Sequence, residues 1–224
     1  MIKKNKETKF PIVLVITSIV CLLPICLSLA VYNDLPESAA MQWNFEGNPN
    51  WYAHKAVLAF GMPLFFMALN IIVFFLVHAD PKHKNASKVM LVFVEWFISV
   101  LSLIIVPLML LTNLDVKMPT VTIVLVLVGI LFVFLGNYMP KNKQNYYIGI
   151  RVSWTLNDPE NWNKTHRMGG FLWIIGGILT IITAFLPLNN IVGITVILII
   201  LLIIAAVPIL YSYSLYKKEK GAVL

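Results

Sequence analysis

Residues 191–211 read IVGITVILIILLIIAAVPILY and contain no charged side chain. An α-helix rises about 1.5 Å per residue, so a run of this length can cross the hydrocarbon core of a bilayer, which is about 30 Å thick. Such continuous apolarity favours a helix, because the strands of a membrane barrel alternate apolar and polar residues. The run therefore predicts a transmembrane helix.

Five further runs of this kind precede it. The six expected spans are 10–31, 57–77, 89–112, 120–138, 168–187 and 191–211. The 224-residue chain is 59% hydrophobic and only 12% charged, whereas an average globular protein has about 25% charged residues. These values exclude an ordinary soluble or disordered protein. We expect an all-α integral membrane protein with six transmembrane helices.

The first span, 10–31, follows four lysines and therefore also resembles a secretory signal. Its apolar part is longer than the roughly 7 to 15 residues of a signal core, which favours a retained helix. The six spans group into two membrane regions of three helices each. We expect an N-terminal region at 1–112, with the polar loop 32–56, and a C-terminal region at 113–224, with the polar loop 139–167.

The basic residues predict how the chain is oriented. Of the 17 Lys and Arg residues, all but Lys55 and Lys117 fall in the two tails, between the second and third spans, or in the loop 139–167. By the positive-inside rule, both termini and the loop 139–167 are cytoplasmic, and the loop 32–56 is external. The net charge of +7 thus indicates topology and attraction to anionic lipid headgroups, and no direct nucleic acid binding.

Glu95 is the only acidic or basic residue well inside an expected span. An intramembrane acid suggests a function such as proton relay. A second interpretation is a protonated side chain, or one that reaches toward the interface, since Glu95 lies only about 10 Å along the helix from Lys88. Two glycine pairs on the fifth span, at 169/176 and 170/177, should let another helix approach closely, and we expect 191–211 to be that helix.

Motifs for catalysis are absent from the sequence: there is no HExxH, no GxSG-type serine and no phosphate-binding glycine loop. We therefore expect no enzymatic activity, no cofactor and no metal site. His78, Asp80 and His83 have metal-ligand side chains, but the neighbouring lysines disfavour an added cation.

The expected external loop contains turn signals at Leu35–Pro36 and 47–50 between aromatic residues. Its aromatic residues fit either membrane-interface anchors or a docking surface for something outside the cell. The candidate external recognition residues are Pro36, Trp43, Asn44, Gly47, Trp51 and Lys55.

In the expected cytoplasmic loop, Asp158 precedes Pro159, a pattern that places an N-cap before the first helical residue. We expect a short helix from Pro159 toward the fifth span, with Trp162 and His166 on one face. The loop also carries aromatic and basic residues suited to headgroup depth. Lipid binding and protein docking are both consistent with this composition.

A set of residues in and around this loop closely resembles the signature of the SdpI family of bacterial membrane immunity proteins. The signature residues are Asn137, Asn145, Gly149, Arg151, Trp154, Thr155, Trp162, Thr165, His166, Arg167, Gly169 and Gly170. The external loop is similar to an uncharacterised membrane domain that often precedes this signature. Two positions depart from the family pattern: Gln42 stands where His is frequent, and Ser153 where Pro is usual.

The resemblance implies a multi-pass protein of the bacterial cell membrane that gives resistance to a secreted antimicrobial or toxin peptide. In one branch of the family, it also implies signalling by an autorepressor held at the membrane. A toxin would then meet the external loop, and a repressor the cytoplasmic loop. The residues themselves leave one alternative, a proton-coupled small-molecule transporter that uses Glu95.

Overall fold

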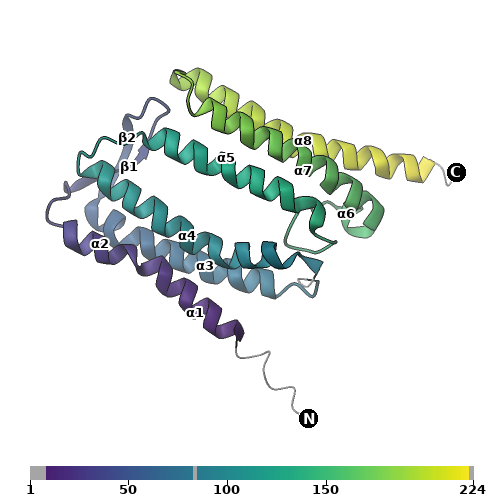
Figure 1. The fold of residues 1–224 in the computed structure, drawn as a ribbon, viewed down its shortest axis with the longest axis horizontal. Coiled ribbons are helices and arrows are strands. Elements are labelled where there is room, and N and C mark those ends of the chain that lie inside the picture. The colour runs from purple at the N-terminus through teal and green to yellow at the C-terminus, as the bar shows by residue number, and fades with distance from the viewer. Residues whose placement is uncertain (1–8, 83–84, 222–224) are drawn as a thin grey trace, which may run out of the picture. The chain divides into compact units, whose positions relative to one another are not determined.

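The computed structural model describes residues 9–82 and 85–221 (Figure 1). Its α-helices are α1 (Lys9–Leu22), α2 (Pro24–Val31), α3 (Met62–His78), α4 (Lys88–Asn113), α5 (Thr120–Tyr138), α6 (Ser153–Asn157), α7 (Pro159–Thr183) and α8 (Asn190–Gly221). A π-helical turn, η1 (Val57–Gly61), precedes α3, and a 3₁₀ turn, η3 (Met139–Lys141), follows α5. Lys3, Lys4 and Lys6 of the basic N-terminal tail, like His83 and Lys84, lie outside the described residues.

Six helical segments of the described chain are long and apolar enough to cross a membrane. They coincide with the six expected spans, so the prediction of an all-α, multi-pass membrane protein is confirmed. The orientation of the termini stays a prediction.

Three spans differ from their expected limits. The first is divided at Leu23, since Pro24 has no amide hydrogen to continue the helical bonding. The fifth begins at Pro159 because Asp158 caps it, accepting hydrogen bonds from the amides of Glu160 (2.8 Å) and Asn161 (2.9 Å). The expected short helix and the fifth span are therefore one helix, α7. The sixth, α8, continues beyond residue 211 to Gly221.

The chain forms two compact units. The first comprises the described residues within Met1–Asn44, Asn48–His78 and Leu91–Thr120, and the second those within Phe45–Gly47, Ala79–Met90 and Val121–Leu224. Each is described by itself below.

Polar contacts join the helices of the first unit. Ser99 and Ser102 of α4 donate to the α1 carbonyls of Thr17 (3.0 Å) and Cys21 (2.9 Å). Asn70 of α3 donates to the Thr17 hydroxyl (3.0 Å). Since lipid is as apolar as a helix surface, packing and such buried hydrogen bonds hold membrane helices together.

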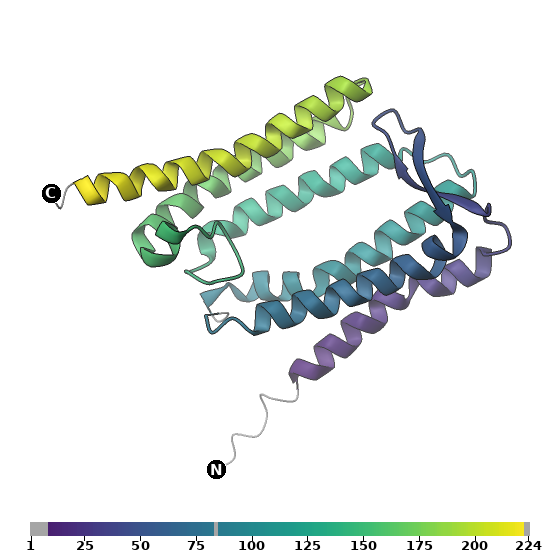
Figure 2. The ribbon, with the colours of Figure 1, turned by 180° about the vertical axis from the view of Figure 1, so that it is seen from behind.

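A β-hairpin follows α2 in the first unit (Figure 2). Strand β1 (Ser38–Trp43) pairs antiparallel with β2 (Pro49–His54), and the register is irregular between Ala40 and Trp43. The sequence predicts turns here but no strands, because residues such as Ala, Asn and Pro are poor strand formers. Tertiary contacts, described below, hold β1 in place.

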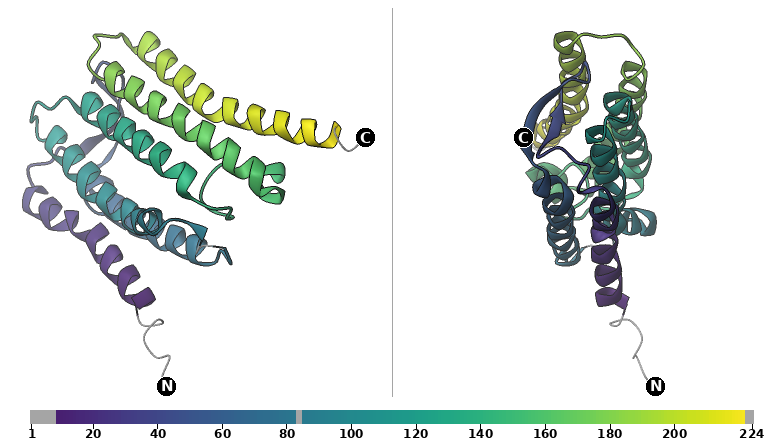
Figure 3. Two further views of the ribbon diagram at one scale, coloured as in Figure 1. Left: turned by 45° about the vertical axis from the view of Figure 1, so that its right-hand side comes forward. Right: turned by 90° about the vertical axis from the view of Figure 1, so that its left-hand side faces the viewer.

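In the second unit, α7 and α8 lie side by side and antiparallel (Figures 1 and 3). Gly176 faces Ile204 of α8, as the sequence predicts, whereas Gly169 lies closest to Ile150 and also contacts Pro208 of α8. The other glycine pair of α7 instead faces α5, because adjacent helical positions point about 100° apart. On that side the backbones of α7 and α5 meet at Gly170/Gly136 and Gly177/Gly129.

Candidate functional site

The signature loop comprises residues 139–167, and its last part, from Pro159, is the start of α7. The preceding residues of the loop pack against this part around the ring of His166. The His166 Nε2 atom accepts a hydrogen bond from the amide of Ile150 (2.9 Å). Its Nδ1 atom lies 2.8 Å from the carbonyl of Trp162, which can only accept. The ring is therefore neutral and carries its proton on Nδ1. It is buried and stacks on the Trp162 indole, with centroids 3.8 Å apart.

Gly149 lets the loop lie directly on this ring. Its φ is +117°, a backbone conformation that residues with a side chain rarely adopt. A Cβ atom at this position would overlap the His166 ring. The signature glycine is thus explained by conformation and by space together.

Thr155 shapes the next part of the loop. Its Oγ1 atom accepts from the amide of Val152 (3.1 Å) and lies 2.9 Å from the carbonyls of Ile150 and Val152. The side chain is fully buried. Thr155 therefore caps α6 and fixes the bend between Ile150 and Val152.

Asn145 performs a similar task before the glycine. Its Oδ1 atom accepts from the amides of Tyr147 (3.1 Å) and Ile148 (2.6 Å), while its Nδ2 donates to the carbonyl of Lys143 (3.0 Å). The side chain is 1% exposed. A buried side-chain amide with these hydrogen bonds stabilises a turn, so its polar atoms are not available to bind a partner.

Thr165 belongs to a polar contact between α7 and α8. Its hydroxyl donates to Asn161 Oδ1 (3.0 Å), and the Ser212 hydroxyl donates to the same oxygen (2.6 Å). Asn161 Nδ2 returns a bond to the Ser212 carbonyl (3.0 Å). The sequence analysis names neither Asn161 nor Ser212, because polar residues on two expected helices give no sign of which ones will meet.

The loop between α3 and α4 also forms hydrogen bonds with the signature loop, and the sequence did not reveal these contacts. Asp80, 1% exposed, accepts from the amides of Lys82 (2.7 Å) and Tyr146 (2.8 Å). Asn142 accepts from the amide of Ser87 (2.9 Å) through Oδ1, and its carbonyl accepts from Trp162 Nε1 (2.9 Å). The one available signal was Asp80 before Pro81, an acid in an otherwise basic segment.

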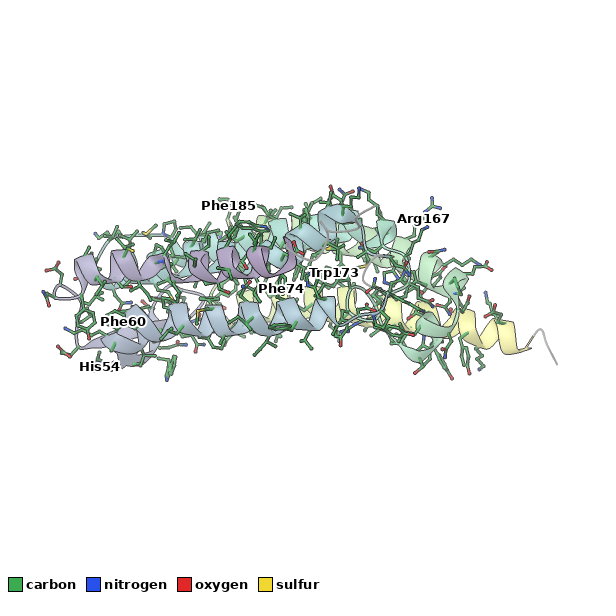
Figure 4. All side chains as sticks on the ribbon, turned by 90° about the horizontal axis from the view of Figure 1, so that it is seen from below. His54, Phe60, Phe74, Arg167, Trp173 and Phe185 are labelled. Carbon is green, nitrogen blue, oxygen red and sulfur yellow. The ribbon has the colours of Figure 1, made fainter. Side chains whose placement is uncertain are left out.

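Apart from Gly149, which has no side chain, and the partly exposed Trp154, the signature residues fall into two groups. The buried ones build the loop and its contacts with the helices: Asn145, Thr155, Trp162, Thr165, His166, Gly169 and Gly170. Asn137, Arg151 and Arg167 are exposed, and Arg167 projects away from the ribbon (Figure 4). Trp154 is partly exposed and stacks on Tyr216, with centroids 5.9 Å apart. Only the exposed group can present side chains to a partner.

Trp154 carries one unusual feature. Its indole Nε1 atom is buried, and no hydrogen-bond partner for it is present in the described part of the chain. Arg151, by contrast, directs one guanidinium nitrogen to the carbonyl of Tyr146 (2.7 Å) while the side chain stays exposed.

A small apolar cavity of about 130 Å³ lies beneath the loop, lined by Met90, Leu135, Ile148, Ile150 and Trp173 among others.

The residues singled out in the external loop have different roles in the hairpin. Asn44 accepts from the amide of Asn48 (2.8 Å) and Gly47 has a φ of +84°, so both form the hairpin turn. Lys55 binds Glu37 at 2.9 Å and lies 4.8 Å from the centre of the Tyr32 ring. The hydrogen bond and charge of Lys55 hold the pKa of Glu37 below its usual value. Pro36 and Trp51 are exposed, and Trp43 is partly buried.

The two outer edges of the hairpin differ. Ala40 of β1 accepts from Asn113 Nδ2 (2.9 Å) and donates to Asn113 Oδ1 (2.6 Å), so its backbone groups point away from β2. Its partner across the hairpin is Tyr52. In such an antiparallel pair both residues direct their N–H and C=O groups outward. Asn113 therefore closes the edge of β1, whereas the edge of β2 at Tyr52 is open within the described chain.

The structure also places the intramembrane acid. Glu95 Oε1 lies 3.2 Å from Nε2 of His78, the last residue of α3. The expected span 57–77 ends one residue before His78, and the sequence gives no sign that this histidine contacts Glu95. Among residues 9–82 and 85–221, no group of three or more His, Cys, Asp and Glu side chains is arranged to hold a metal ion.

Comparison with known proteins gives two matches to family models and one similar protein. Residues 141–212 match the SdpI/YfhL protein family, and residues 19–67 match a domain of unknown function, DUF1648. The chain is 28% identical over 215 residues to a Bacillus subtilis (strain 168) protein named Immunity protein SdpI, covering 93% of this chain and 98% of that protein. No solved structure matches. The family resemblance inferred from the signature residues is therefore confirmed.

Proposed function

We propose that this chain, which matches the SdpI/YfhL family over residues 141–212, is a membrane immunity protein that protects its cell against a secreted antimicrobial peptide. The observation that carries the proposal is the similarity to the Immunity protein SdpI, which extends over nearly the full length of both chains. The six membrane-spanning helices are consistent with protection at the bilayer itself.

The open edge of β2 is the surface proposed to meet the peptide. An extended peptide can add to such an edge through main-chain hydrogen bonds. Trp51 and Tyr52, 55% and 50% exposed, lie on this strand and offer apolar contact area. The loop 32–56 has three acidic residues and a single lysine, so it favours a cationic peptide. The predicted topology places this loop outside the cell.

The exposed signature residues are the surface proposed for a second partner, an autorepressor at the cytoplasmic face. Arg151 and Arg167 supply exposed guanidinium groups, and the exposed part of the Trp154 ring supplies apolar contact area. Arginine and tryptophan are enriched among the residues that dominate protein interfaces. Anionic lipid headgroups are the competing ligand for the same charges.

The immunity proposal is tested by expressing the chain in sensitive bacteria and measuring growth inhibition by a panel of membrane-active cationic peptides. We expect the inhibitory concentration of at least one peptide to rise. Arg151→Ala and Trp154→Ala should abolish the gain at unchanged abundance in the membrane, whereas Lys218→Ala, which removes an exposed base outside the signature, should not. Unchanged sensitivity to every peptide would refute the immunity function.

The role of the β2 edge is tested separately with Tyr52→Pro. Proline removes the outward N–H of residue 52 without removing a bond between β1 and β2, and edge strands tolerate such a proline. Resistance should fall further in Tyr52→Pro than in Tyr52→Thr, because both variants lose the ring and only Tyr52→Thr keeps the N–H. Equal resistance in both variants would show that the peptide does not bind as an added strand.

A fluorescent fusion of a candidate autorepressor tests the cytoplasmic partner. The fusion should move to the membrane when the chain is present, and it should stay in the cytoplasm with Arg151→Ala. Recruitment that depends only on anionic lipid content, and is equal for both forms of the chain, would favour headgroup binding instead.

A further inference from the structure

The pair formed by His78 and Glu95 belongs to neither proposed surface. His78 ends α3 and Glu95 lies on α4, and their side chains are only 16% and 19% exposed. The imidazole stacks on the Phe74 ring, with centroids 4.2 Å apart, and Phe74, which is labelled in Figure 4, is itself buried. Ionisable groups inside a membrane region are costly unless they are paired. The stability of this contact therefore depends on how many protons the two side chains carry.

The hydrogen bond of His78 to Phe74 and its ion pair with Glu95 determine the number of protons that the two side chains share. Nδ1 lies 2.9 Å from the carbonyl oxygen of Phe74. A carbonyl cannot donate, so Nδ1 carries a proton. The other nitrogen, Nε2, faces Glu95 Oε1 at 3.2 Å. A hydrogen bond there needs one more proton, which sits either on the imidazole or on the carboxyl group.

We infer that His78 and Glu95 together form a binding site for one proton, which ties the end of α3 to α4. With that proton the pair is neutral overall, either as imidazolium and carboxylate or as imidazole and carboxylic acid. Without it, the Nε2 lone pair faces a carboxylate, and a net negative charge remains in an apolar region. Loss of the proton therefore breaks the contact between the two side chains.

The surrounding helices add few other charges. The described side chains of α1 include no Asp, Glu, Lys, Arg or His, and on α3 the single ionisable residue is His78. On α4 the other one is Lys88, which is exposed and two helical turns from Glu95. The contact between His78 and Glu95 is therefore the ion pair seen between the described side chains of α3 and α4.

Infrared difference spectroscopy of the full chain in lipid nanodiscs tests the inference. A pH increase should convert the wild-type pair to the carboxylate and neutral-imidazole form. The resulting carboxylate or imidazole bands should be lost in Glu95→Gln and altered in His78→Gln. Glu95→Gln should still fold, because its amide can donate to Nε2. Glu37→Gln, a change in an exposed acid outside the pair, should leave the bands unchanged.

Two results would overturn the inference: no pair-specific band over the whole pH range in which the protein stays folded, or the same Glu95 band in wild type and His78→Gln. The readout is spectroscopic, so it does not depend on whether the chain confers resistance to a peptide. Failure of the immunity assay and failure of the proton site are therefore separate outcomes.

Discussion

Gly149 lies so close to the ring of His166 that a Cβ atom at position 149 would overlap Nε2. The amide of the next residue, Ile150, donates to that same nitrogen at 2.9 Å. The loop is therefore fixed to α7 by one hydrogen bond and one close contact at a single ring. These two contacts with His166 explain why the signature loop has a defined conformation near Gly149.

Gly149→Ala should destabilise the protein by about 3 kcal/mol or more, since it adds both backbone strain and overpacking against a buried ring. Gly47→Ala is the matched control, because Gly47 also has a positive φ of +84° but has no atom within 4 Å of a Cβ position. That variant should lose only the strain, about 1–2 kcal/mol. Unfolding in detergent measures both, and equal losses would contradict the close packing on His166.

The glycines of α7 should respond differently to alanine according to what they face. A Cβ at position 177 would lie 2.5 Å from the backbone oxygen of Gly129, which cannot move without shifting α5. A Cβ at position 176 would meet a methyl group of Ile204 at 2.6 Å, which is a side-chain atom and not part of the backbone of α8. We expect a clearly lower midpoint of thermal unfolding for Gly177→Ala than for Gly176→Ala. The reverse order would show that α5 and α7 are not in backbone contact.

Thr155→Val should cost about 1–3 kcal/mol, because it removes the oxygen that accepts from the Val152 amide. Thr155→Ser keeps that oxygen and should retain most of the stability. Hydrogen exchange of the Val152 amide provides the local measurement. It should accelerate in the valine variant only, and protection retained in Thr155→Val would mean that another group satisfies this amide.

Lys55→Met should raise the pKa of Glu37 toward its ordinary value, because the hydrogen bond and charge of Lys55 are the main causes of the lowered pKa. The folded-state pKa lies below the unfolded one, so the contact stabilises at neutral pH and is lost as the pH falls through the folded-state pKa. His54→Gln should have a smaller effect, since His54 contributes less. A carbon-13 NMR titration of the Glu37 carboxyl group measures both, and a larger shift in His54→Gln would reverse this assignment.

The membrane class and the six spans could be predicted from the sequence because hydropathy over about 20 residues is a local property. The cap at Asp158 was also local, and the structure confirms it. The resemblance to the SdpI family was recognisable from residues such as Gly149, Trp162 and His166, whose close packing constrains what can replace them.

The roles of those residues were decided only by tertiary structure. His166 and Ile150 are separated by 16 positions, and Asn161 and Ser212 by 51, so no local pattern predicts their hydrogen bonds. The same holds for Asn113, which closes the edge of β1 from α4, and for the pairing of His78 with Glu95. Sequence determined which segments enter the membrane, because transfer from water depends on composition. Tertiary structure decided which signature side chains are buried supports and which remain exposed, because burial and hydrogen bonding depend on neighbours that are distant in the chain.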